Sequence, residues 1–416
     1  MLVYTARHLL PVGSPPVVDG AVAVADGRVV AVGRRKDVVK SVKAAEVRDL
    51  GEAIVMPGLV NAHTHLELSW MHEVGLPDGD YVGWIRAVVA RRGDADEARI
   101  RAAAKAAIEG MTSRGTVAVG DVQNTTLVPA LLAASTLRGV MFHELLGWRA
   151  ADAERILERA AVALDAIESD RAVKEARGRL LLALTPHAAH STSAPLLKAL
   201  GGRAAATSEP IAIHVAESED EVRLLRDGTG PFADFLRERG VWDDAWKAPG
   251  LTPVDHLDRL GLLTPRTLAV HGVHLTHTDM ARLQARGTTV VTCPRSNRTL
   301  GVGVAPVPKL LGSGIPVAIG TDSLASSPDL DLFAEIQALR EEHPTLAPAA
   351  ALRMATLNGA RALGISADLG TIEKGRLASL VVVPLEDPAW DPIEVVTWNP
   401  AAAFALDAAP WEARAA

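Results

Sequence analysis

Short apolar runs alternate with longer amphipathic stretches through the middle of the chain. The runs have the length of buried β-strands, and the segments between them, such as 95–114, 151–176 and 330–340, are rich in Ala, Leu and Arg, as helices are. A βα unit that recurs eight times predicts an α/β protein, specifically a (β/α)8 TIM barrel. The eight expected strands are 54–63, 116–122, 139–147, 179–187, 210–217, 267–273, 288–294 and 315–322.

Both ends of the chain carry shorter runs with a β-like pattern. Residues 21–33 place Val and Ala on either side of Asp26-Gly27, which is a strong signal for a hairpin turn. Residues 369–385 repeat this pattern around a Lys-Gly pair. Neither piece has enough strands for a stable sheet by itself, so we expect the two ends to meet in one sheet domain.

The expected domain boundaries follow from this arrangement. Residues 57–365 form the catalytic barrel, and residues 1–56 and 366–416 form a small composite β-sandwich domain. The barrel then exceeds the roughly 250 residues that are typical, so insertions are needed, and the Trp-, Asp- and Pro-rich stretch 241–255 is the first candidate. The alternative, a doubly wound open sheet, would require a Gly-rich phosphate loop after its first strand, and the sequence has none there.

Composition and charge narrow the class of protein. Hydrophobic residues make up 48% of the 416 residues and the net charge is −7, without a Lys/Arg cluster that would follow a phosphate backbone, so nucleic acid is not expected as a partner. No uninterrupted run of eighteen apolar residues and no signal peptide are evident, and Cys293 is the single cysteine. We therefore expect a cytoplasmic protein without a membrane partner, compatible with a homodimer.

Histidines and a carboxylate stand at the ends of the expected strands. His63 and His65, in "NAHTH", point to the same side of a strand, while His214 and Asp322 end the fifth and eighth strands. In a TIM barrel these carboxyl ends converge on one rim. Three imidazoles and one carboxylate suit zinc or ferrous iron rather than magnesium or calcium. We predict one divalent ion, zinc first and iron second, held by these four side chains.

Further polar side chains occupy the same rim. His187 and His271 end the fourth and sixth strands, Glu217 follows His214 by three residues, and Asn297 follows the seventh strand. Each histidine alone could be an ordinary rim residue, and Glu217 could be a carboxylate that favours a helix N-terminus. All of them on one rim are better explained by a catalytic site. His271 is expected beside the metal rather than as a ligand.

The order of these motifs resembles the amidohydrolase superfamily, in particular its branch of metal-dependent aromatic deaminases. The likeness runs from "DGRVVAVG" through "MPGLVNAHTH", "TPHA", "HVAES", "VHGVHL", "CPRSN" and "GTDSLASS" to "GTIEKGRLASLVVV", with Ser379 as a departure where relatives often carry Asp. The resemblance implies hydrolytic release of ammonia: Asp322 accepts the proton of the attacking water, Glu217 shuttles a proton to the ring nitrogen, and His271 orients the hydroxide. A catalytically silent barrel used as a binding module would need neither Glu217 nor His271.

The stretches "HTHLELS", "PRSNRTLGVG" and "GTDSLASSPDLDLF" are most similar to the aminodeoxyfutalosine deaminases of menaquinone biosynthesis. That resemblance implies 6-amino-6-deoxyfutalosine, an aminopurine nucleoside extended by a benzoate, as the substrate. His187, Trp84 and Asn297 are then expected at the substrate, and Arg149 or Arg295 at its carboxylate. S-adenosylhomocysteine, adenosine and guanine stay open as substrates, as does a chlorinated triazine for a chlorohydrolase of the same branch.

Overall fold

The computed structural model describes residues 1–43, 46–75, 77–398, 400 and 402–406. It divides into two compact units. One unit comprises Met1–Asn61, Glu109–Ala118 and Asp331–Ala416, and the other comprises Ala62–Ile108 and Val119–Leu330. The domain boundaries expected at residues 57 and 365 stay a prediction, and the last part of the expected composite domain, 407–416, lies outside the described residues.

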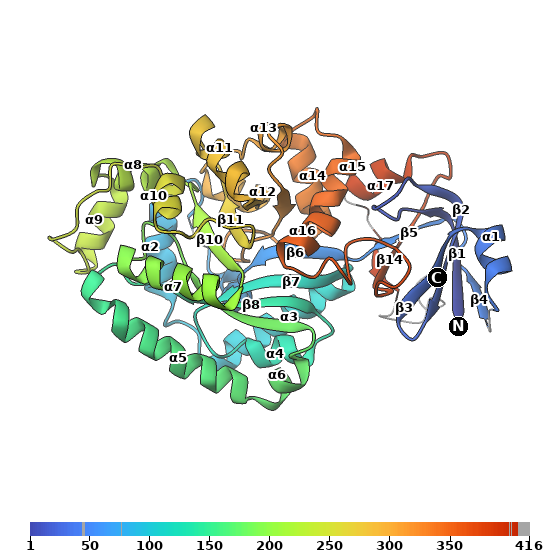
Figure 1. Cartoon of the computed structure of the whole chain (residues 1–416), viewed down its shortest axis with the longest axis horizontal. Helices are drawn as coiled ribbons and strands as arrows, with labels where there is room; N and C mark the ends of the chain where they lie inside the picture. Colours follow the sequence, from blue (N-terminus) through green and yellow to red (C-terminus); the bar gives the residue numbers. More distant parts are fainter. Residues whose placement is uncertain (44–45, 76, 399, 401, 407–416) are drawn as a thin grey trace. The chain divides into compact units, whose positions relative to one another are not determined.

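The barrel strands form two parallel four-stranded sheets, in the orders β6-β7-β8-β9 and β10-β11-β12-β13 (Figure 1). Isolated parallel bridges, Thr64 with Asp322 and Ala188 with His214, connect the two sheets and close the ring. The predicted (β/α)8 barrel is therefore confirmed. Its strands are β6 (Leu59–Thr64), β7 (Thr116–Gln123), β8 (Arg138–Leu145), β9 (Leu180–Pro186), β10 (Ile211–Val215), β11 (Thr267–His271), β12 (Thr289–Thr292) and β13 (Val317–Ile319).

The first expected strand, 54–63, is two strands rather than one. The chain breaks at Gly58, whose N–H donates to the carbonyl of Ser379 over 2.8 Å instead of continuing a single ladder. A Cβ at Gly58 would lie 2.3 Å from Cγ1 of Val117, so the close approach of backbone and side chain requires glycine. The part before the break, β5 (Ala53–Pro57), joins the sheet of the chain ends, and the part after it begins the barrel.

Both chain ends contribute to one sheet, as expected. Among the described residues it has seven strands, in the order β15-β14-β5-β1-β2-β3, with β4 paired to β1. Asp26 and Gly27 have φ angles of 50° and 70° and make the predicted hairpin turn between β2 and β3. The remaining strands are β1 (Leu2–Leu9), β2 (Val17–Ala25), β3 (Arg28–Arg34), β4 (Glu46–Asp49), β14 (Leu380–Pro384) and β15 (Phe404–Ala405).

The second expected hairpin, at 369–385, does not form. Only β14 is a strand there, and it pairs antiparallel with β5. The residues before β14 form turns, because the guanidinium of Arg376 binds the carbonyls of Ser366 and Leu369 and holds that segment in a compact loop. The strand expected before the Lys-Gly pair was therefore wrong, whereas the strand expected after it is present as β14.

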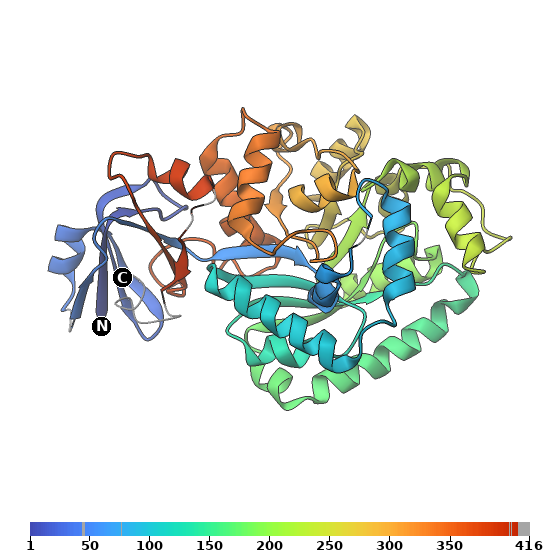
Figure 2. The same cartoon turned by 180° about the vertical axis from the view of Figure 1, so that it is seen from behind.

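Helices flank the barrel strands, and the 180° view shows α2 unobstructed (Figure 2). The helix expected at 151–176 is interrupted at Asp170, whose carboxylate accepts from the N–H groups of Ala172 and Val173 and begins a new helix.

No helix in the described part of the chain is long and apolar enough to cross a membrane. The α-helices are α1 (Arg35–Ser41), α2 (Tyr81–Arg91), α3 (Glu97–Ser113), α4 (Pro129–Ala134), α5 (Ala153–Ser169), α6 (Arg171–Ala176), α7 (Ala194–Thr207), α8 (Glu219–Asp227), α9 (Pro231–Glu238), α10 (Pro253–Arg259), α11 (His277–Arg286), α12 (Pro294–Leu300), α13 (Val307–Gly312), α14 (Leu332–Glu342), α15 (Pro348–Arg353), α16 (Gly359–Ala362) and α17 (Pro392–Thr397). Shorter helical segments are η1 (Leu66–Glu73), η2 (Ala150–Asp152) and η3 (Met354–Asn358).

Candidate active site

The four side chains expected to hold a metal lie together at the carboxyl ends of the strands. His63 is in β6, His65 follows it, His214 is in β10 and Asp322 follows β13, and all four are buried. Nε2 of His65 is 3.4 Å from Nε2 of His214, and Oδ1 of Asp322 is 3.8 Å from Nε2 of His63 and 3.6 Å from Nε2 of His65. These donors form two overlapping groups, His63 with His65 and Asp322 and His63 with His214 and His271, each compact enough to hold a divalent ion.

Neighbouring groups orient two of these side chains. Nδ1 of His214 donates to the carbonyl of His187 over 2.8 Å, which leaves the lone pair of Nε2 directed at the other imidazoles. Oδ2 of Asp322 accepts hydrogen bonds from Ser296 (2.6 Å) and Ser326 (3.0 Å), which leaves Oδ1 directed at His63 and His65. The donor set therefore fits a divalent ion with three nitrogen ligands and one oxygen ligand.

The protonation states also fit a metal site. Burial lowers the pKa of His63 well below its usual value, and burial also lowers the pKa of His65. Burial alone would raise the pKa of Asp322, but the nearby His65 and His271 and the Ser296 hydrogen bond bring that pKa below its usual value. Neutral imidazoles and an ionised carboxylate are the forms that bind metals.

Backbone strain is concentrated on the same rim. Ala216, His271 and Asp322 have positive φ angles of 50°, 69° and 58°, a region that residues with a side chain rarely occupy. These three are among seven such non-glycine residues in the described chain, and each stands at or just after a strand end. The surrounding hydrogen bonds hold the rim in a conformation that the backbone alone would not favour.

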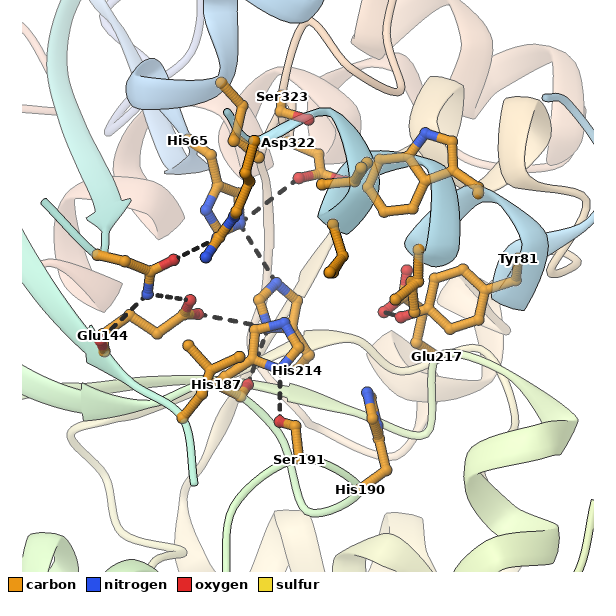
Figure 3. A pocket seen from close by; sticks show the side chains of 18 of the residues that line it. His65, Tyr81, Glu144, His187, His190, Ser191, His214, Glu217, Asp322 and Ser323 are labelled. Atoms are coloured by element: carbon orange, nitrogen blue, oxygen red, sulfur yellow. Dashed lines mark hydrogen bonds and ion pairs between the residues drawn. The ribbon is translucent and has the colours of Figure 1, made fainter. Parts of the chain in front are cut away.

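Glu217 faces the metal-binding cluster without being part of it. Its carboxyl accepts a hydrogen bond from the hydroxyl of Tyr81 over 2.5 Å at Oε2, and its Oε1 is 3.6 Å from Nε2 of His271 (Figure 3). Burial raises the pKa of Glu217 to about 7, so both the acid and the carboxylate are populated near neutral pH. Nδ1 of His271 is 2.9 Å from Oδ1 of Asn297, and because an amide oxygen only accepts, Nε2 of His271 presents its lone pair to the site.

Of the five predicted substrate contacts, two line the pocket above this cluster. His187 and Trp84 are lining residues, whereas Arg149, Arg295 and Asn297 are not among the described residues that line it. Arg149 donates to the carbonyl of Gly240, Arg295 pairs with Asp329 at 2.6 Å, and Asn297 holds His271. The pocket therefore does not receive the two arginines that were expected to meet a carboxylate.

Several residues that line the pocket were not predicted, among them Tyr81, Arg92, Glu144 and His190. Glu144 lies opposite Glu217 across His214, accepts from Asn124 over 2.9 Å and is 3.9 Å from Nδ1 of His214 (Figure 3). A signal for it existed, because a glutamate in the apolar third strand is unusual. Tyr81 and Arg92 are carried by α2, and their approach to the rim has no local motif.

A closed parallel barrel with imidazoles and a carboxylate at the carboxyl ends of its strands can hold a divalent ion that activates water for hydrolysis. Comparison with known proteins identifies the family to which the chain belongs. Residues 54–409 match the amidohydrolase family. An aminodeoxyfutalosine deaminase from Deinococcus radiodurans is 35% identical over 352 residues, 83% of this chain and 81% of that protein. A 5-methylthioadenosine/S-adenosylhomocysteine deaminase from Nitratidesulfovibrio vulgaris is 32% identical over 413 residues, 95% of this chain and 85% of that protein.

Among solved structures, an adenosine deaminase from Xanthomonas campestris with bound zinc has a TM-score of 0.79 and 28% sequence identity, with 96% of this chain and 89% of that chain covered. The chain belongs to the amidohydrolase family. It is an amidohydrolase-type hydrolytic deaminase.

Proposed function

We propose that the protein deaminates an aminopurine nucleoside and that this substrate is 6-amino-6-deoxyfutalosine, on the route to menaquinone. The observation that carries the reaction is the buried Glu217 carboxyl beside the cluster of imidazoles and Asp322. The likeness to the Deinococcus enzyme supports the finer substrate. The relatives that act on methylthioadenosine and S-adenosylhomocysteine support the nucleoside class and supply the competing substrates for a test.

His63, His65, His214 and Asp322 would hold one divalent ion, for which we propose zinc. Three imidazole nitrogens and one carboxylate oxygen are an ordinary zinc environment, and zinc is present in the Xanthomonas structure. When bound, such an ion would lower the pKa of a water molecule to roughly 7 and so supply hydroxide at neutral pH.

The side chains of this chain then move the protons. Ser296 and Ser326 donate hydrogen bonds to Oδ2 of Asp322, so its Oδ1 is the oxygen that accepts the proton of the attacking water. Glu217, with a pKa of about 7, holds a proton for the ring nitrogen next to the carbon that carries the amine. Nε2 of His271 accepts a hydrogen bond from the nucleophile and orients it. The proton held by Asp322 leaves with the amine as ammonia, and the remaining proton of the added water returns to Glu217 as the ring carbonyl forms.

The test is ammonia release by metal-loaded protein from 6-amino-6-deoxyfutalosine, S-adenosylhomocysteine, 5′-methylthioadenosine, adenosine and guanine. We expect the highest kcat/KM for the first compound. A higher value for S-adenosylhomocysteine or methylthioadenosine would overturn the specific substrate while leaving nucleoside deamination intact. Absence of ammonia release from every compound, with one ion bound per chain, would overturn the nucleoside class itself.

A further inference from the structure

One face of α2 forms a continuous wall of the pocket. Five of its side chains line the cavity at helical spacings of three and four residues, and Arg92, directly after the helix, continues the same face. The wall begins at Tyr81, which contacts Glu217, and ends at an exposed arginine. The lining residues of this face are Tyr81, Trp84, Ile85, Val88, Val89 and Arg92.

Helix α9 packs beside α2 and adds further apolar side chains to the pocket. Phe232, Phe235 and Leu236 line the same pocket from this helix. Arg86 fixes the two helices to each other, because it pairs with Glu238 at 3.0 Å and its guanidinium lies 5.7 Å from the ring of Phe235. The two helices pack on each other through Tyr81 and Phe232, whose ring centroids are 5.8 Å apart, and together they form one apolar side of the pocket, suited to an uncharged arm of a substrate.

Arg92 brings a positive charge to the edge of this apolar side of the pocket. It is the one lysine or arginine among the described lining residues. Its Nη2 donates to the neutral amide oxygen of Asn124 over 2.7 Å, and no carboxylate of the described chain pairs with it. Its neighbour Arg91 instead pairs with Asp94 at 3.4 Å, and Arg86 pairs with Glu238. No carboxylate of the described residues lies within ion-pair distance of Arg92, and its charge only partly offsets the effect of burial, which raises the pKa of Glu67. Asn124 orients the guanidinium, whose remaining donors are left for an anionic ligand.

We propose that Arg92 determines substrate specificity by pairing with a terminal carboxylate on an apolar arm of the nucleoside. The proposal rests on the proposed function, because Glu217 and Tyr81 mark the position of the reacting ring. Nη2 of Arg92 donates to Asn124 over 2.7 Å, Asn124 donates to Glu144 over 2.9 Å, and Glu144 is 3.9 Å from Nδ1 of His214, so the guanidinium lies on the side of the pocket next to the metal-binding cluster. The preferred substrate then carries its anion on that side of the pocket, at the end of an arm that runs along the apolar face of α2.

The experiment compares matched ligands and matched variants. The ligands are 6-amino-6-deoxyfutalosine, its carboxyl methyl ester, 5′-methylthioadenosine and adenosine, and the variants are Arg92→Gln, Arg92→Lys and the neighbouring control Arg91→Gln. We expect Arg92→Gln to lower kcat/KM for the free carboxylate by about 10- to 200-fold, the loss of one charged hydrogen bond. The ester, methylthioadenosine and adenosine should change by less than about threefold, and Arg92→Lys should retain part of the preference.

Several results would overturn the proposal. An equal loss of kcat/KM on all four ligands in Arg92→Gln would assign Arg92 a structural role. If Arg92→Gln kept the preference for the carboxylate over its ester, the proposed ion pair would be wrong. A selective loss in Arg149→Gln, with Arg92→Gln unaffected, would assign the carboxylate to the other arginine. If the unmodified enzyme deaminates none of the ligands, the proposed function fails. If it deaminates adenosine and methylthioadenosine but does not prefer the carboxylate to its ester, only this inference fails.

Discussion

The rim of the barrel and the wall formed by α2 and α9 are built by opposite means. On the rim, side chains from strands far apart in sequence are fixed by hydrogen bonds and by strained backbone, as at His271 and Asp322. The wall is two helix faces whose apolar side chains recur every three or four residues. On the proposed function, the rim acts on the bond that is broken, and the wall selects the molecule that is presented to it. Variants of the rim should affect all substrates alike, whereas variants of the wall should discriminate among them.

The largest effect is expected from His63→Ala. Loss of one imidazole leaves an incomplete donor set, so the divalent ion should be lost and ammonia release should fall to background with every substrate. Metal content per chain, measured by mass spectrometry, and ammonia release check this outcome. His277→Ala, which removes an exposed histidine in α11, is the control and should keep both. Full metal occupancy in His63→Ala would place this histidine outside the ligand set.

Glu217→Gln should retain the metal and lower kcat by roughly 10²–10⁴ for all substrates, because proton transfer to the ring is removed. The acid form of Glu217 donates the proton and its pKa is about 7, so kcat/KM of the unmodified enzyme should fall as pH rises through about 7. The variant should lack this alkaline decline. Loss of the ion in Glu217→Gln would instead indicate that the carboxylate is a ligand.

Tyr81 tests the distinction between rim and wall, because it belongs to α2 in the wall but contacts Glu217 on the rim. A hydrogen bond to a charged group contributes about 1.5–3 kcal/mol, so Tyr81→Phe should lower kcat by about 10- to 100-fold. Its loss should fall equally on adenosine and on substrates with an arm, and should shift the alkaline decline to higher pH because the carboxylate form of Glu217 loses a donor. Tyr4→Phe, at the other tyrosine of the chain, should not alter the pH profile. A loss confined to substrates with an arm would assign Tyr81 to the wall alone.

The smallest effect on activity is expected at Glu221, which contacts the backbone of Glu217 and is not one of the described pocket-lining residues. Its Oε2 accepts from the N–H of Glu217 over 3.0 Å, and burial raises its pKa to about 8. A raised pKa in the folded state gives stability that is complete below the unfolded pKa, near 4.5, and that is lost as pH rises through about 8. Glu221→Gln should therefore show a smaller fall in Tm between pH 6 and 9 than the unmodified protein. Parallel pH profiles of Tm would contradict this role.

The sequence was sufficient for the barrel and for the convergence of the four expected ligand side chains. This was possible because periodicity locates strands, and because a residue at the carboxyl end of a barrel strand has a known side of the molecule to face. Gly58 was harder to interpret, since the apolar run on both sides of it hides the change from one sheet to another. The approach of Tyr81 and Arg92 to the rim could not be predicted, because it depends on where α2 packs rather than on any spacing. The two arginines chosen instead follow strands, yet their side chains bind other groups.

The bridge that closes the barrel has a consequence for the order of synthesis and assembly. It joins Thr64 to Asp322, which lie 258 residues apart in the chain, next to ligands expected on the first and last strands. With the proposed ligands, a nascent chain that has emerged only as far as β12 can offer the three imidazoles but not the carboxylate of Asp322, so tight binding of the ion must wait until nearly the whole barrel is available. Closing so long a loop is slow, and binding of the ion stabilises only the completed barrel. On this ligand set, metal binding depends on finished folding as well as supporting the chemistry.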